Sequence, residues 1–168
     1  MNQAYLHIVL VHLPVVLMPV AAVVVLIGMI LKNRSVEVVA LSMIVCAAVL
    51  AVPVFLLGEG AEEVVEHLPG ISEEVIEEHE ESAELAIWLS GAVGSVSAVA
   101  LLGYAGGFWW SLALCRVVFV SALAASVSLG YTAHRGGAIR HPEAYSAQVG
   151  EVMGSEEDEK KESTHPEK

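Results

Sequence analysis

Cysteine and positive charge are both scarce in this chain. Its two cysteines, Cys46 and Cys115, fall inside apolar stretches and are interpreted as small packing residues. No CxxCH pattern occurs, which excludes a haem attached through such a motif, and HExxH and CxxC metal patterns are missing as well. Neither a Ser–His–Asp nor a Cys–His catalytic arrangement is indicated, so we expect no enzymatic activity from the chain alone.

The chain has 8 Lys and Arg against 20 Asp and Glu, a formal net charge of −12. A nucleic-acid partner needs a basic patch and is excluded. The acidic residues gather in residues 59–84 and at the end of the chain, where residues 143–168 are predicted to form a flexible, disordered tail. Such acidity suits basic partners or cations, and equally the solvated surface of a halophilic protein.

Charged side chains are almost absent from four long stretches, in a sequence that is 55% hydrophobic. About 20 apolar residues cross a bilayer as a helix, and none of these stretches shows the polar face of a soluble helix. Residues 1–142 are therefore predicted to form an all-α, antiparallel bundle of four transmembrane helices. The predicted spans are residues 6–31, 37–57, 83–104 and 109–133.

Small residues at helical spacing predict close helix contacts within lipid. They are Gly91, Ser95 and Gly103 in the third span, and Ala122, Ser126 and Gly130 in the fourth.

The acidic loop, residues 58–82, is predicted to be partly helical. A short helix over GEGAEEVVEHLPG should end at Leu68-Pro69-Gly70. Ser72 is then expected to cap a helix that begins at about residue 73 and runs on into the third span.

The first loop carries Lys32 and Arg34, whereas the second is purely acidic. The positive-inside rule places the first loop in the cytoplasm. Both termini and the acidic loop are then expected on the periplasmic side of a bacterial inner membrane.

Four histidines fall at this predicted periplasmic end: His7, His12, His79 and His134. A histidine in or beside a bilayer span is costly and calls for a reason. His79 is predicted to face inward, because Val75, Ile76, Ala83 and Ala86 share its side of a helix while most of the neighbouring Glu residues do not.

Each histidine also has a plain interpretation as a hydrogen-bonded residue. His12 could donate to a backbone carbonyl left without a donor near Pro14 and Pro19. His79 could pair with Glu, His7 could lie at the interface, and His134 could be a cation at a helix C-terminus.

Imidazoles projected into a bundle from facing helices are what a b-type haem needs. We expect His12 and His79 to ligate the haem iron, with His7 and His134 as a second pair or as supporting partners. Arg135 or Arg140 is expected to meet the haem propionates.

A non-haem site is the main alternative. Glu59, Glu62 and Glu63, together with His12 and His79, offer mixed nitrogen and oxygen ligands for Zn²⁺ or iron.

The opening YLHIVLVHLPVVL resembles the H-x4-HFP-type start of a family of uncharacterised bacterial four-helix membrane proteins. The resemblance covers about residues 3–142 and includes the turn LLGEGAEE, the histidine entering the third span and the glycine pair of HRGGAIRH. The chain departs from the family pattern in its acidic loop, residues 59–82, and in its shortened closing stretch, which leaves His141 without a clear counterpart. The resemblance implies a likeness to small membrane cytochromes.

These observations together predict a membrane electron-transfer subunit that resembles a b-type cytochrome. It would lie in lipid, contact other subunits of a respiratory complex, and pass electrons between the membrane pool and a periplasmic redox partner. The alternatives are a divalent-metal-binding or transport-associated membrane protein, and a purely structural subunit of a larger membrane complex.

Overall fold

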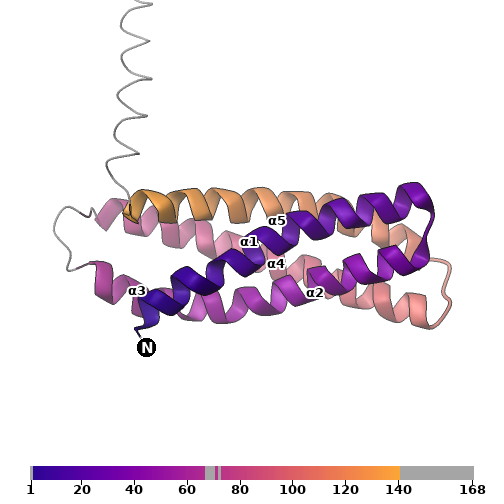
Figure 1. The fold of residues 1–168 in the computed structure, drawn as a ribbon, viewed down its shortest axis with the longest axis horizontal. Helices are drawn as coiled ribbons and strands as arrows, with labels where there is room; N and C mark the ends of the chain where they lie inside the picture. Colours follow the sequence, from indigo (N-terminus) through magenta and orange to yellow (C-terminus); the bar gives the residue numbers. More distant parts are fainter. Residues whose placement is uncertain (1, 67–70, 72, 141–168) are drawn as a thin grey trace, which may run out of the picture.

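Four long helices, packed antiparallel, make up almost all of the computed structural model, which describes residues 2–66, 71 and 73–140 (Figure 1). The helices are α1 (Gln3–Leu31), α2 (Arg34–Leu56), the short α3 (Gly58–Val65), α4 (Glu73–Ala105) and α5 (Ser111–Arg140). The prediction of an all-α four-helix bundle is confirmed. Each long helix is long and apolar enough to cross a membrane, so the chain is a multi-pass membrane protein. The predicted tail, residues 143–168, lies outside the described residues.

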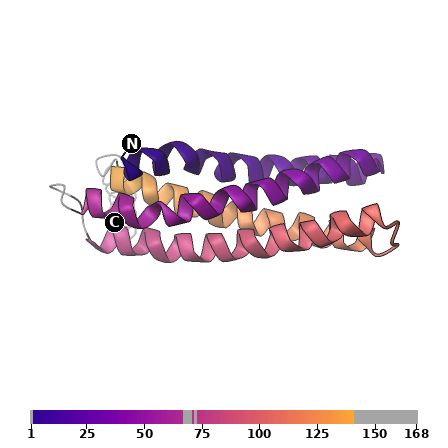
Figure 2. The ribbon, with the colours of Figure 1, turned by 90° about the horizontal axis from the view of Figure 1, so that it is seen from below.

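The turns that join α1 to α2 and α4 to α5 lie together at one end of the bundle (Figure 2). The other end, called the N-terminal end below, carries the start of α1, all of α3, the first turns of α4 and the last turns of α5. Helix α1 packs chiefly on α2 and α5, and α4 packs chiefly on α5 and α2. Helices α1 and α4 therefore face each other across the bundle.

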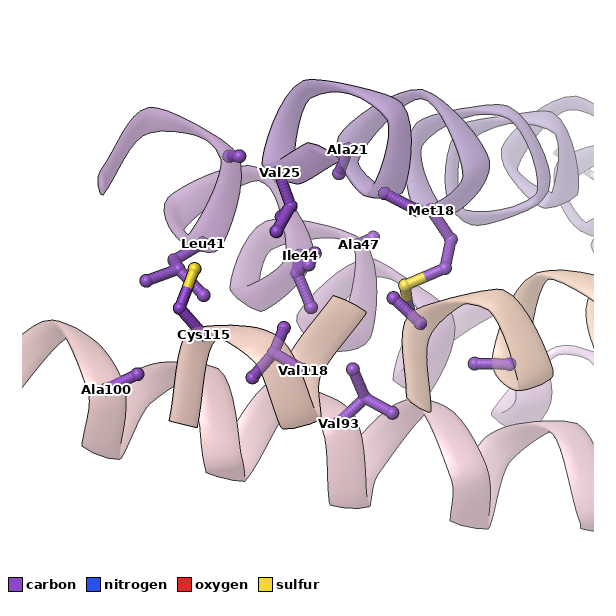
Figure 3. Close-up of a cluster of buried hydrophobic side chains, with 14 of the residues drawn as sticks. Met18, Ala21, Val25, Leu41, Ile44, Ala47, Val93, Ala100, Cys115 and Val118 are labelled. Atoms are coloured by element: carbon purple, nitrogen blue, oxygen red, sulfur yellow. The ribbon is translucent and has the colours of Figure 1, made fainter. Parts of the chain in front are cut away.

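Fully buried apolar side chains fill the middle of the bundle (Figure 3). Met18 and Val25 from α1 meet Leu41 and Ile44 from α2 and Val118 from α5, and none of these five side chains is exposed. The opposite faces of the helices carry exposed Val, Leu and Ile, which is the pattern of a bundle solvated by lipid.

A buried carboxylate joins two helices at the end with the short turns. Lys32 takes a left-handed conformation (φ 50°) that ends α1, and the Asn33 side chain accepts the backbone N–H of Ser35 to begin α2. Glu37, only 4% exposed, accepts a hydrogen bond from the Tyr104 hydroxyl of α4. A Cβ on Gly28 would lie 2.8 Å from Glu37 Cγ, so α1 approaches this carboxylate closely only because residue 28 is glycine.

The close helix contacts use the predicted rows of small residues only in part: Gly103 and Ala122 are buried, but the Gly91 side of α4 is not used. Gly91 and Ser95 are exposed, and a Cβ on Gly91 would meet nothing within 4 Å. Gly94 makes the close contact with α2 instead, since a Cβ added to Gly94 would lie 2.5 Å from the Cβ of Ala48. The buried polar residues Ser90 and Ser97 share this face of α4, so the contact row is turned by roughly 100° around α4 from the position of Gly91.

The two helices predicted for the acidic loop are present, and the last helix of the chain is longer than predicted. The predicted helix end at residues 68–70 lies outside the described residues. Helix α3 occupies the expected stretch, and α4 begins at Glu73, directly after Ser72, which itself is outside the described residues. Helix α5 continues to Arg140, although its predicted span ends at residue 133. Packing supports the extension: Ala138 is buried, and Gly136 lies against His79 of α4.

Candidate functional site

The structure brings His7 and His79 together at the N-terminal end of the bundle. His7 lies on the second turn of α1 and His79 on the second turn of α4. Their ring centroids are 6.4 Å apart and the ring planes make an angle of 83°. His79 faces inward with Ala83 and Ala86, as the sequence pattern predicts.

Backbone carbonyls of two other helices fix the tautomer of both rings. His7 Nδ1 lies 2.9 Å from the carbonyl oxygen of Val54 on α2, and His79 Nδ1 lies 3.1 Å from that of Thr132 on α5. A carbonyl only accepts, so each Nδ1 must carry the proton and donate it. In the neutral form of a ring held this way, Nε2 carries the lone pair, which is the arrangement found in metal-ligating histidines.

The neutral state of His79 is favoured by its surroundings. His79 precedes the apolar part of α4, and burial lowers its pKa. The hydrogen bond to Thr132 raises this pKa, and the nearby His7 lowers it. The balance is a pKa below the ordinary histidine value, so His79 offers an unprotonated Nε2 at neutral pH.

A small cavity of about 60 Å³ lies beside the two imidazoles. Its other walls are mainly apolar and come from all four long helices, with Pro14, Phe55 and Ile87 among them. The buried Thr132 hydroxyl also lines it and has no hydrogen-bond partner among the described residues. A buried polar atom in this state carries an energetic cost that a bound ligand or water would remove.

Of the two glycines that lie against the pair, only one is needed for a close approach. A Cβ on Gly136 would lie 3.0 Å from His79 Cε1, closer than nearly all real contacts of this kind. A Cβ on Gly58 would lie 4.0 Å from His7 Cε1, an ordinary contact distance. Gly136 therefore has a packing role that Gly58 lacks, since a larger residue at position 136 would displace the His79 ring.

The structure does not bring His12 to His79. His12 is exposed on the outer face of α1, and its Nδ1 donates to the carbonyl of Ile8, 2.8 Å away in the same helix. His12 is thus a hydrogen-bonded residue of α1, as in the alternative interpretation given above. His12 follows His7 by five residues, which turns it about 140° around the helix, so the two cannot face the same site.

The other predicted site residues lie around the pair without joining it. His134 is exposed and does not line the cavity. Arg135 pairs with Glu78 of α4 and donates to the Tyr131 hydroxyl, in a groove between α4 and α5. The Arg140 side chain and all of His141 fall outside what the structure describes.

The predicted mixed site of carboxylates and imidazoles is not assembled. Glu59 and Glu63 are exposed on α3, and Glu62 is half-buried. Across residues 2–66, 71 and 73–140, no three His, Cys, Asp or Glu side chains come together as a metal site. The described part of the chain therefore offers a pair of nitrogen ligands and no third.

Glu62 does have a partner, which is another carboxyl group. Glu80 lies on the Glu-rich first part of α4, before its apolar segment, and its side chain hydrogen-bonds to that of Glu62 on α3. This bond, with partial burial and the charges of Glu59 and Glu77, raises the pKa of Glu80 to about 7. This bond links α3 to α4, whereas the packing of α3 is chiefly on α1 and α2.

Two residues of the site are not predicted by the sequence. Val54 and Thr132 contribute backbone carbonyls, which side-chain chemistry does not reveal. Val54 lies in the last turn of α2, where carbonyls lose their usual helical partners and can accept from elsewhere. The glycine pair of residues 136–137 is visible in the sequence, but its contact with His79 depends on the extension of α5.

Comparison of the chain with known protein families, with curated proteins and with solved structures gives no match.

Proposed function

We propose that this protein is a membrane electron-transfer subunit that binds one b-type haem through His7 and His79. The observation that carries the proposal is the state of the two imidazoles. Each donates its Nδ1 proton to a backbone carbonyl, which leaves Nε2 as the ring atom that could bind a metal, and both rings line the same mainly apolar cavity.

The number of ligands favours haem over a bare ion. A haem iron takes four nitrogens from its macrocycle and needs only two from the protein. A structural zinc ion takes about four protein ligands, whereas the described residues bring two together.

The positions of the two rings also support the proposal. Their centroids are 6.4 Å apart and both rings line the same cavity, so one metal centre bound there would be within reach of both histidines.

The cavity has room for an ion and a water molecule, but it is too small for the macrocycle. Binding of haem thus requires the helix ends around the pair to separate. The cavity lies near the ends of the helices, and its lining includes the small residues Ala51, Ala83 and Ala133 beside larger ones such as Phe55 and Ile87.

When bound, haem would supply reversible one-electron transfer. The chain would hold the ring orientation through Val54 and Thr132 and keep the site apolar through the surrounding alanines. From Lys32 and Arg34 at the opposite turn, we place the N-terminal end on the periplasmic side, where a redox partner would dock.

The test is the haem content of the full-length protein purified from haem-supplied cells, compared with that of the variants His7→Ala and His79→Ala. We expect about one haem per chain in the wild type and less than a tenth of that in either variant. Equal haem content in all three proteins would refute the assignment.

A second candidate is a small transition-metal ion in place of haem, with electron transfer no longer implied. The cavity of about 60 Å³ and the unpartnered Thr132 hydroxyl favour it, since both suit an ion with a bound water. Elemental analysis distinguishes the two candidates: a stoichiometric metal without a visible haem spectrum would support the ion, and iron with that spectrum would support haem.

A further inference from the structure

A second concave site, separate from the histidine cavity, lies between α4 and α5. It is a groove of about 610 Å³. The α4 side runs from Glu78 through Ser82 and Leu85 to Leu89, and the α5 side runs in the opposite direction from Arg135 to Ala124. The groove thus follows the helices for eleven residues, or about 16 Å at 1.5 Å per residue.

The polarity of the groove changes along its length. Its upper part, at the N-terminal end of the bundle, holds Glu78, Glu81, Tyr131 and Arg135. Its lower part has walls of Leu85, Leu89, Ala124 and Val127, within the apolar segments of the two helices. A ligand that fits both parts is an amphiphile with a compact polar head and an apolar tail.

Contacts at the polar end define the head group. The Arg135 guanidinium pairs with Glu78 and donates to the Tyr131 hydroxyl oxygen from Nε at 2.9 Å and from Nη2 at 2.6 Å. Because that oxygen accepts from the guanidinium, the phenolic proton of Tyr131 is directed away from it. The polar end therefore presents a hydroxyl donor beside an arginine that is already neutralised.

The charge of this end disfavours a phospholipid. Two carboxylates, Glu78 and Glu81, face one guanidinium, that of Arg135, which leaves a net charge of −1. An anionic phosphate would lie beside Glu81 and would have to displace Glu78 from Arg135. A neutral head group with carbonyl oxygens would accept a hydrogen bond from the Tyr131 hydroxyl. It would neither be repelled by Glu81 nor need to displace Glu78 from Arg135.

We propose that the groove between α4 and α5 binds an isoprenoid quinone, with its ring at Tyr131 and Arg135 and its tail along Leu85, Leu89 and Val127. A quinone carries two carbonyl oxygens on an uncharged ring and a long apolar tail, which matches the two parts of the groove. The biological meaning of this site rests on the proposed electron-transfer function: Thr132, whose carbonyl holds His79, directly follows Tyr131, so the groove and the histidine pair are neighbours.

The experiment uses full-length protein in phosphatidylcholine nanodiscs, with decylubiquinone as the probe. Native mass spectrometry after release from the nanodisc counts the quinone molecules bound per chain. The blocking variant is Val127→Trp, at a lipid-facing position that is 73% exposed and borders the groove. The matched control is Val120→Trp, two turns away on the same face of α5, 65% exposed and outside the groove lining.

We expect one decylubiquinone per wild-type chain, an occupancy at least tenfold lower in Val127→Trp, and a change of less than twofold in Val120→Trp. Tyr131→Phe should lower the affinity while leaving the haem content unchanged. Equal occupancy in Val127→Trp and wild type would overturn the proposal. So would displacement of the quinone by an equimolar amount of phosphatidylglycerol, which would identify a phospholipid site.

The experiments distinguish an error in the quinone proposal from an error in the haem proposal. His79→Ala removes a haem ligand but leaves the groove lining intact, so quinone binding should persist in that variant. A quinone that binds to wild-type protein containing no haem would support the groove and refute the haem assignment.

Discussion

His7 and His79 lie with their ring centroids 6.4 Å apart, although they belong to helices that face each other across the bundle and pack chiefly on other helices. The contact is thus made by side chains that reach into the centre from opposite sides. Their Nδ1 atoms are held by the carbonyls of Val54 and Thr132, so each of the four long helices contributes to the orientation of the pair.

Replacement of either paired histidine should abolish cofactor binding, whereas replacement of His12 should not. We expect His7→Ala and His79→Ala to lower the haem content at least tenfold, because each removes one of the two histidines that would hold the haem iron. His12→Ala is the matched control, since His12 is exposed and bonds only to its own helix. Haem content is measured by the pyridine haemochrome spectrum. A loss in His12→Ala as large as in His7→Ala would contradict the assignment of the pair.

The two adjacent glycines of α5 should respond differently to a methyl group. In Gly136→Ala the new Cβ would lie 3.0 Å from His79 Cε1, so the ring must move, and we expect cofactor affinity to fall by roughly 10–100-fold. In Gly137→Ala the Cβ would meet nothing within 4 Å. That variant should keep its affinity within twofold and gain up to about 1 kcal/mol of helix stability. Equal affinities in cofactor titrations of the two variants would show that Gly136 does not position His79.

A second glycine comparison tests the packing of the bundle itself. Gly94→Ala places a Cβ 2.5 Å from that of Ala48, and we expect it to destabilise the bundle by about 1–3 kcal/mol. Gly91→Ala adds its methyl group on the exposed side of the same helix and should be neutral or slightly stabilising. Unfolding in mixed micelles of increasing dodecyl sulfate fraction gives both values. A larger effect at position 91 would place the helix contact on the other face of α4.

The contact between α3 and α4 should weaken as the pH rises. The pKa of Glu80 is raised to about 7 in the folded protein, so the folded state binds this proton more tightly than the unfolded state does. The resulting stabilisation is full below the ordinary pKa of 4.5 and is lost as the pH rises through about 7. Hydrogen exchange of the α3 amides, corrected for the intrinsic rate, should therefore be slower at pH 5.5 than at pH 8.

Glu80→Gln provides the control for this pH effect. Glutamine can donate a hydrogen bond to Glu62 at any pH, so the difference between the two pH values should largely disappear. A pH dependence of α3 exchange that is unchanged in the variant would assign the effect to another group.

The sequence predicts the four long helices well, because the length of each uncharged apolar stretch is enough to indicate a membrane-spanning helix. An apolar stretch of about 20 residues in lipid must satisfy its backbone hydrogen bonds internally, which a helix does. The start of α4 is also predictable, because Glu73 and Glu74 are typical of the first turn of a helix. The end of α5 is less predictable, because the helix continues through Gly136 and Gly137 for reasons of packing against α4.

The sequence does not show whether His7 or His12 faces the interior of the bundle. Helix α1 is apolar around its whole circumference, so hydrophobic periodicity does not indicate which side faces the bundle. The two histidines point in directions about 140° apart, and only the packing of α1 on α2 and α5 selects His7. The same limit explains why the contact row of α4 is centred on Gly94 and not on Gly91.

The most direct test of the central claim is the visible absorption spectrum of the detergent-purified protein, recorded oxidised and then reduced with dithionite. The account predicts a Soret band that shifts on reduction, with sharp α and β bands from a low-spin iron held by two imidazoles. Protein from haem-supplied cells with no absorption above 350 nm in either state would contradict it.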